Sequence, residues 1–99
     1  MVFASCLGRW SAEREHVWLI GSTDSAAQDR FELFETLLEA IAPHAAVEGP
    51  ALLNRRITAK MAQQALLTTA TFHSDDSLRI RAARQAQRQL AVCDTLVMG

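Results

Sequence analysis

The stretch from Ser74 to Met98, SDDSLRIRAARQAQRQLAVCDTLVM, carries the clearest helical pattern in the chain. Its small and apolar residues recur at intervals of three and four, which places them on one side of an α-helix. These residues are Ala82, Ala83, Ala86, Leu90, Cys93 and Val97. The arginines Arg81, Arg84 and Arg88 fall on the other side. A helix with one long apolar side needs other elements to cover it, so the pattern predicts a helical domain.

The rest of the 99-residue chain contains three further helical patterns, separated by turn signals. Asp24 and Ser25 are good N-caps, Pro43 ends the pattern that follows them, and Pro50 suits the first turn of the next helix. The predicted helices cover residues 2–20, 25–42, 51–72 and 75–98. The apolar face of the second consists of Phe31, Phe34, Leu37, Leu38 and Ile41. Four helices with short connections predict one all-α domain, a four-helix antiparallel bundle with up-down-up-down order.

Residues 2–20 admit two interpretations. Apolar residues at spacings of three and four indicate a helix; they are Phe3, Cys6, Leu7, Trp10, Val17 and Ile20. The segment from His16 to Ile20, HVWLI, is also typical of a short buried strand. The helix is preferred because its stripe continues over nearly five turns. It places Glu13 within the apolar stripe, and it includes Gly8 at a cost of about 1 kcal/mol relative to alanine.

The predicted helix over residues 51–72 is apolar on two sides. Its main stripe comprises Leu53, Ile57, Met61, Ala65, Thr68 and Phe72, and a second patch contains Leu52 and Leu66. We expect the main stripe to meet the apolar sides of the other helices. A helix that is apolar on two sides is usually sandwiched between neighbours or covered by a second subunit.

Charge is divided unevenly along the chain, although the net charge is −1. Three bases and eight acids up to Pro50 give −5, and seven bases and three acids after it give +4. Such a division favours self-complementarity. We therefore predict a partner-binding surface in which the arginine row meets the acidic row of a second copy. The two rows are Arg81, Arg84 and Arg88, and Glu32, Glu35 and Glu39.

The cysteine pattern and the absence of targeting signals predict a cytoplasmic protein. No apolar run reaches the roughly 18 residues of a membrane span, and no signal-peptide pattern is present. Two cysteines are too few for a secreted disulfide scaffold, so we expect reduced thiols. An up-down-up-down bundle brings Cys6 and Cys93 to the same end, where they are expected as neighbouring core residues, with a disulfide as the alternative.

Glu13 is the most informative ionisable residue. A carboxylate within an apolar stripe needs a partner, and Arg30 lies opposite it in an antiparallel hairpin, so we predict a buried Glu13–Arg30 ion pair that fixes helix register. The alternative is a charge that anchors a ligand in a cavity. Glu13 and His16 also form Glu-x-x-His, the pair used by di-iron bundles, but the helix over residues 51–72 supplies no acid.

No pattern predicts catalysis. None of His16, His44 and His73 has an adjacent cysteine or serine in a recognisable catalytic pattern, and no glycine-rich phosphate loop is present. We predict a non-enzymatic protein–protein interaction module without a cofactor or metal, which acts through charged helix faces as a homodimer. One alternative is a transcriptional regulator that binds DNA through the arginine row, although a net charge of −1 disfavours nucleic acid. The other is a helical bundle that binds a small ligand or metal around Glu13 and His16.

Overall fold

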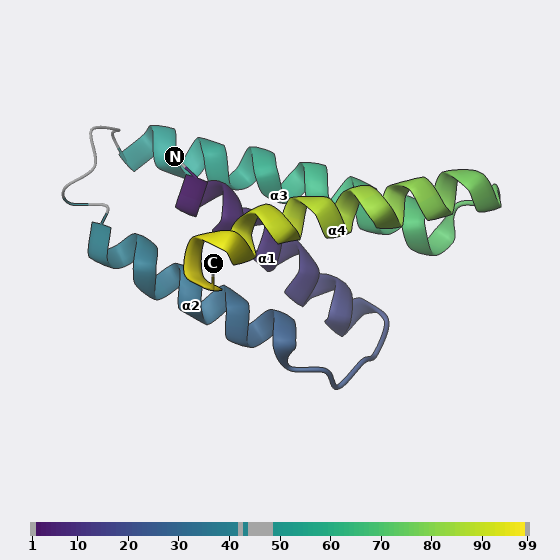
Figure 1. Ribbon diagram of the computed structural model, residues 1–99, viewed down its shortest axis with the longest axis horizontal. Helices are drawn as coiled ribbons and strands as arrows, with labels where there is room; N and C mark the ends of the chain where they lie inside the picture. Colours follow the sequence, from purple (N-terminus) through teal and green to yellow (C-terminus); the bar gives the residue numbers. More distant parts are fainter. Residues whose placement is uncertain (1, 42, 44–48, 99) are drawn as a thin grey trace.

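The computed structural model describes residues 2–41, 43 and 49–98, and within them it contains four α-helices and no strand (Figure 1). The helices are α1 (Val2–Leu19), α2 (Ala26–Ile41), α3 (Gly49–Phe72) and α4 (Asp76–Met98). The predicted all-α bundle is confirmed, and each predicted helix end lies within two residues of the observed one. The strand interpretation of HVWLI is wrong, because residues 16–19 are helical. His44 lies outside the described residues.

Local features of the chain end α1 and begin α2 and α4. Gly21 has a φ of 71°, the left-handed conformation that glycine adopts at helix ends. Asp24 caps α2, since its Oδ1 accepts a hydrogen bond of 2.9 Å from the Ala26 amide. Asp75 Oδ1 accepts from the Leu78 amide at 3.1 Å and caps α4 in the same way. These caps satisfy amide groups that the helices leave without a partner.

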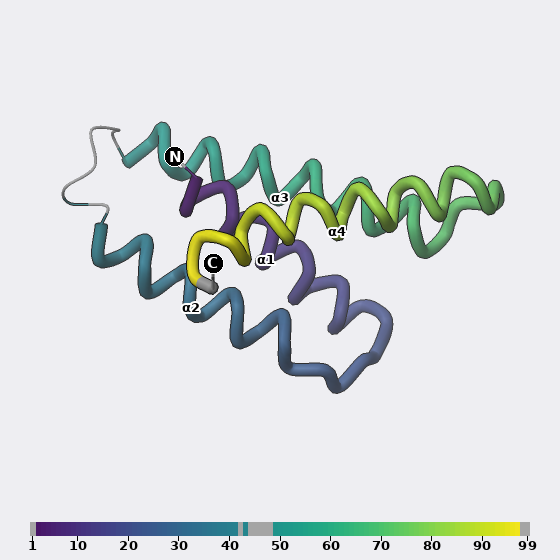
Figure 2. The backbone as a smooth tube through the Cα atoms, viewed as in Figure 1, coloured from purple at the N-terminus to yellow at the C-terminus, as the bar shows by residue number. Residues whose placement is uncertain are grey.

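α1 is the central helix of the bundle. It packs against all three others, and its most extensive contact is with α3. Figure 2 shows α1 passing between α2 and α3, while the α3–α4 hairpin extends past it. In an up-down-up-down bundle of square section, the first and third helices would lie on a diagonal. The predicted neighbour order is therefore not confirmed.

The hydrophobic core joins α1 and α2 to the C-terminal half of α4. Its buried residues are Cys6, Leu7, Trp10, Ala27, Phe31, Phe34, Leu90 and Cys93. Most of these residues belong to the predicted stripes of the first, second and fourth helices, and Ala82 and Ala86 are buried as predicted. Ala83 is exposed. In the described residues no helix combines the length and apolar character that crossing a membrane requires.

Small residues in α1 bring its backbone close to that of α3. Ala4, Gly8 and Ala12 are spaced by four residues, so they share one face of α1, and all three are buried. A Cβ atom built on Gly8 would overlap the Arg56 carbonyl oxygen in α3. Glycine is therefore required here for close helix packing, which explains its place inside a helix.

The main apolar stripe of α3 faces outward, so the prediction that it meets the other helices is wrong. Leu53, Ile57, Met61 and Phe72 are 54%, 48%, 59% and 62% exposed, whereas Leu52 of the second patch is 7% exposed. The buried face of α3 packs on the small residues of α1 and includes Gln63, whose amide makes two hydrogen bonds. Both sides of α3 are apolar. The side that contains Leu52 is buried because the backbones of α1 and α3 pack closely there.

Candidate functional site: an exposed helix face and a cationic groove

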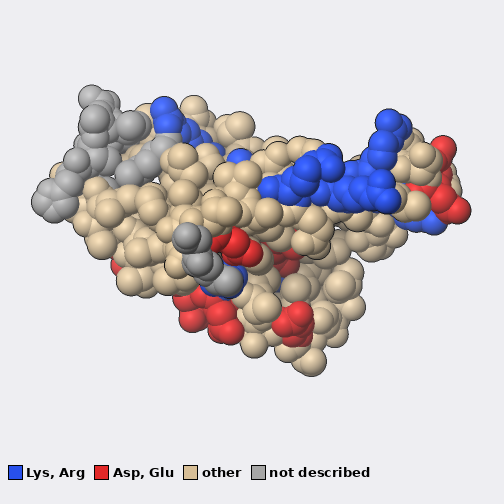
Figure 3. All heavy atoms as spheres, in the orientation of Figure 1, with Lys and Arg blue, Asp and Glu red and all other residues tan. Residues whose placement is uncertain are grey.

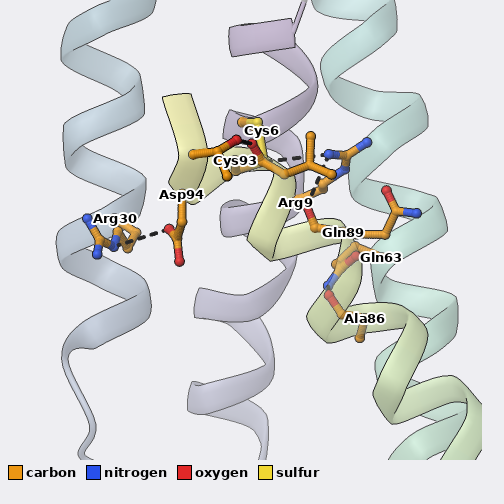
Figure 4. Close-up of a disulfide and its surroundings, with 10 residues drawn as sticks. Cys6, Arg9, Arg30, Gln63, Ala86, Gln89, Cys93 and Asp94 are labelled. Atoms are coloured by element: carbon orange, nitrogen blue, oxygen red, sulfur yellow. Dashed lines mark hydrogen bonds and ion pairs between the residues drawn. A yellow bond between two sulfur atoms is a disulfide. The ribbon is translucent and has the colours of Figure 1, made fainter. Parts of the chain in front are cut away.

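Cys6 and Cys93 form a disulfide that joins the start of α1 to the end of α4 (Figure 4). Both residues are fully buried, and their Cα atoms are 5.6 Å apart, within the range that disulfides span. Their predicted proximity is confirmed, but the expectation of reduced thiols is wrong in this structure. The cytoplasmic location stays a prediction, and a structural disulfide is more typical of oxidising compartments.

Arg9 lies beside this disulfide and contacts α4 (Figure 4). Its Nη1 donates to the Gln89 carbonyl oxygen at 3.2 Å and to Cys93 Sγ at 3.5 Å. Burial lowers the pKa of the Arg9 guanidinium, because removal from water disfavours the charged form. Among the described residues, no carboxylate forms an ion pair with Arg9. Arg9 is therefore a half-buried cation without a compensating anion from that part of the chain.

Arg9 lines two adjoining depressions between α1, α3 and α4. The first has a volume of about 460 Å³, and its polar lining consists of Ser5, Arg9, Asn54, Arg55 and Thr58. The second, of about 340 Å³, shares Arg9, Ala59 and Ala62 with the first and extends to Gln63, Gln85 and Gln89. We call the two together the Arg9 groove. Among the described residues, its lining contains two cations, Arg9 and Arg55, and no carboxylate.

Glu13 and Arg30 have different partners from those predicted. Glu13 is partly buried, as expected, but its Oε2 accepts a hydrogen bond of 2.9 Å from Gln63 Nε2. Arg30 Nε lies 3.7 Å from Asp94 Oδ1, so the ion pair of α2 is formed with α4. Burial raises the pKa of Glu13, and the hydrogen bond from Gln63 and the charge of His16 oppose that effect. In place of the predicted Glu13–Arg30 pair, Glu13 of α1 bonds to α3 and Arg30 of α2 pairs with α4.

The residues of the predicted Glu-x-x-His site bond to α3. His16 Nε2 lies 3.1 Å from Thr71 Oγ1, and Glu13 accepts from Gln63. Glu15, which stands between them in the sequence, accepts from Lys60 at 2.8 Å. In residues 2–41, 43 and 49–98, no three His, Cys, Asp or Glu side chains gather in a way that could hold a metal ion.

The two charged rows lie on different helices and are not paired with each other. Arg81, Arg84 and Arg88 are exposed on α4, where Figure 3 shows a band of basic side chains. Glu32 and Glu39 are exposed on α2, and Glu35 is partly exposed. The ion pairs between described residues are Arg30–Asp94, Lys60–Glu15 and Arg79–Asp76, so neither row is neutralised by an ion pair within that part of the chain.

The outward face of α3 exposes four large apolar side chains in one row. We call Leu53, Ile57, Met61, Ala65, Thr68 and Phe72 the α3 stripe. Leu19 of α1, 70% exposed, lines a depression of about 250 Å³ that reaches Thr68 of the stripe. Apart from alanine and cysteine, six apolar side chains of the described residues are buried, whereas thirteen large ones are exposed. Contiguous apolar patches on a soluble surface usually mark interaction sites.

Comparison of the chain with protein families, with curated proteins and with solved structures finds no significant match. The sequence pattern indicated both charged rows and the apolar stripe of α3, although it predicted that the stripe meets the other helices, and it gave no prediction for Arg9 or Gln63. The one available signal was polarity. Arg9 follows Gly8 and Gln63 follows Ala62, each within a helical segment. A polar side chain that is buried at such a position needs a partner.

Proposed function

We propose that this chain is a non-enzymatic protein–protein interaction module that acts as a homodimer, with the α3 stripe at the dimer interface. The observation that carries the proposal is the exposure of four large apolar residues, Leu53, Ile57, Met61 and Phe72, along one face of a 24-residue helix. Burial of apolar surface is the main favourable contribution to protein association. A second helix laid along this face would bury all four.

A second copy of the chain fits this face in an antiparallel orientation. In a twofold dimer of α3 helices, Leu53 of one copy would lie near Phe72 of the other, and Ile57 near Thr68. The basic residues of α3 are Arg55, Arg56 and Lys60, all in its first half, and α3 has no acid. Antiparallel pairing separates these cations, whereas parallel pairing would bring them together.

The charged rows support self-association in addition to the apolar face. Arg81, Arg84 and Arg88 on one copy are complementary to Glu32, Glu35 and Glu39 on another, and twofold symmetry would form that contact twice. Neither row has an ion pair among the described residues of its own chain. Complementary surface charge increases the association rate and the specificity of the contact.

Sedimentation equilibrium at micromolar concentration tests the proposal. We expect a dimer for the wild type and a monomer for Met61→Glu, which places a charge at the centre of the stripe. Val2→Glu is the matched control, because Val2 is 49% exposed but belongs to α1, outside the α3 stripe and both charged rows. Circular dichroism checks that both variants remain helical. A wild-type monomer across the concentration range, or equal dissociation by both variants, would show that the stripe is not a dimer interface.

The exposed arginine row also favours one alternative function, binding to duplex DNA through α4. Such binding would weaken steeply with salt, because neutralised phosphates release counterions. If the monomeric Met61→Glu variant binds duplex DNA and Arg84→Glu abolishes that binding, the DNA function replaces the interaction module.

A further inference from the structure

We infer that the Arg9 groove is a binding site for a small organic oxyanion, a carboxylate or a phosphate, held between Arg9 of α1 and Arg55 of α3. Both arginines line the first depression of the groove, and none of the described residues that line either depression is acidic. Arginine presents a planar set of N–H donors that matches the paired oxygens of carboxylate and phosphate groups. The site is distinct from the α3 stripe and goes beyond the proposed dimer.

Arg9 retains donors for a ligand. A guanidinium has five N–H donors, and Nη1 alone makes the two hydrogen bonds to Gln89 and Cys93. Nε and Nη2 donate to no described residue, so one edge of the guanidinium has both nitrogens free for a two-point contact. A partly buried cation without a compensating charge is unfavourable, and binding of an anion relieves that cost.

The rest of the groove indicates the kind of molecule that carries the anionic group. Ser5, Asn54 and Thr58 add hydroxyl and amide groups close to the two arginines. Three alanines, Ala51, Ala59 and Ala62, form the apolar part of the same wall. The volume of about 460 Å³ lies within the range of small-molecule sites, roughly 300–1,000 Å³. A ligand with a short apolar body and a carboxylate or phosphate head fits this lining.

A purely structural role for Arg9, in which it only links α1 to α4, makes a different prediction for Arg55. Arg55 is exposed and forms no hydrogen bond or ion pair with the described residues, so the fold does not depend on its charge. If Arg9 serves the fold alone, either the groove binds no anion, or any anion binding is independent of the Arg55 charge. If the groove is a site, both charges contribute.

Isothermal titration calorimetry with three probes tests the site: succinate, inorganic phosphate and the neutral analogue succinamide, with sodium chloride added to equalise ionic strength. We expect succinate or phosphate to bind and succinamide not to bind. The stronger anion identifies the head group. Arg9→Gln and Arg55→Gln should each weaken binding at least tenfold, while the control Arg84→Gln, on the exposed face of α4, should not.

Two results would overturn the inference: no binding of either anion, or equal binding by wild type, Arg55→Gln and Arg84→Gln. Because Arg9→Gln also loses a contact with α4, Arg55→Gln keeps the test valid if the first variant is unfolded. The titrations are repeated with Met61→Glu. Retained anion binding in that variant shows that the groove functions without the dimer, so the two proposals fail or hold separately.

Discussion

Gly8 of α1 lies directly against the backbone of Arg56 in α3. A methyl group on Gly8 would overlap the Arg56 carbonyl oxygen and lie 3.0 Å from the Lys60 amide nitrogen. Both obstacles are backbone atoms, which cannot rotate away as a side chain can. The position of α3 on α1, and therefore the face that α3 turns outward, depends on the missing side chain of residue 8.

Gly8→Ala is expected to destabilise the protein, although alanine favours a helix over glycine by about 1 kcal/mol. Overpacking of a tight contact costs about 1–3 kcal/mol, and here the backbone must also shift. Urea unfolding measures the loss. Gly49→Ala is the control, since the added methyl group would have no atom of another described element within 4 Å. A Gly8→Ala variant as stable as Gly49→Ala would contradict the close packing of α1 and α3.

Loss of the Cys6–Cys93 disulfide is expected to lower the free energy of unfolding by about 3–5 kcal/mol, because the bond closes a long loop with a sequence separation of 87. Urea unfolding with and without reductant measures the effect. The Cys6→Ala, Cys93→Ala double variant should resemble the reduced wild type and should not respond to reductant. Thiol titration of the unfolded wild type, without reductant, should detect no free thiol; two free thiols would contradict the bond.

The Glu13 carboxyl should make stability depend on pH. Burial raises its pKa above the ordinary value of 4.5, so the folded state binds a proton more tightly than the unfolded state. This contribution is fully present below pH 4.5 and is lost as the pH rises through the raised pKa. Wild type should therefore gain stability relative to Glu13→Gln as the pH falls from neutral. An unchanged difference in unfolding free energy across that range would contradict the effect.

Charge reversal tests the role of the two rows in the proposed dimer. Arg84→Glu and Glu35→Lys should each weaken self-association, because each homodimer then contains two like-charge contacts. Exposed ion pairs contribute about 0.2–1 kcal/mol each, so we expect a loss of roughly tenfold in affinity. An equimolar mixture of the two variants restores both contacts in the heterodimer. Sedimentation of the mixture should show that the affinity of dimer formation recovers. If the mixture dimerises no more tightly than either variant alone, the two rows do not belong to the interface.

Much of the architecture could be predicted from local features of the chain. Apolar spacing, the prolines and the acidic caps were enough to predict four helices, since these signals act within a few residues. The core positions of α2 and α4, such as Phe34 and Leu90, followed from the same spacing. The partial burial of Glu13 was also predicted, because the stripe of α1 contains it.

The partners of those residues could not be predicted in this way. Glu13 bonds to Gln63, and Arg30 pairs with Asp94, because α1 lies against α3 and the end of α4 lies near α2. The Arg9 groove also depends on that arrangement, since its two cations come from separate helices.

The spacing of apolar residues was sufficient to predict four helices and the buried side of α2 and α4, because periodicity is a property of one helix. Which side of α3 faces the core depends instead on how the helices pack. Both sides are apolar, so spacing cannot distinguish them, and the choice depends on the fit between two backbones. Gly8 allows α1 and α3 to approach closely along the face that contains Leu52 and Gln63, and this contact leaves Met61 and Phe72 on the surface.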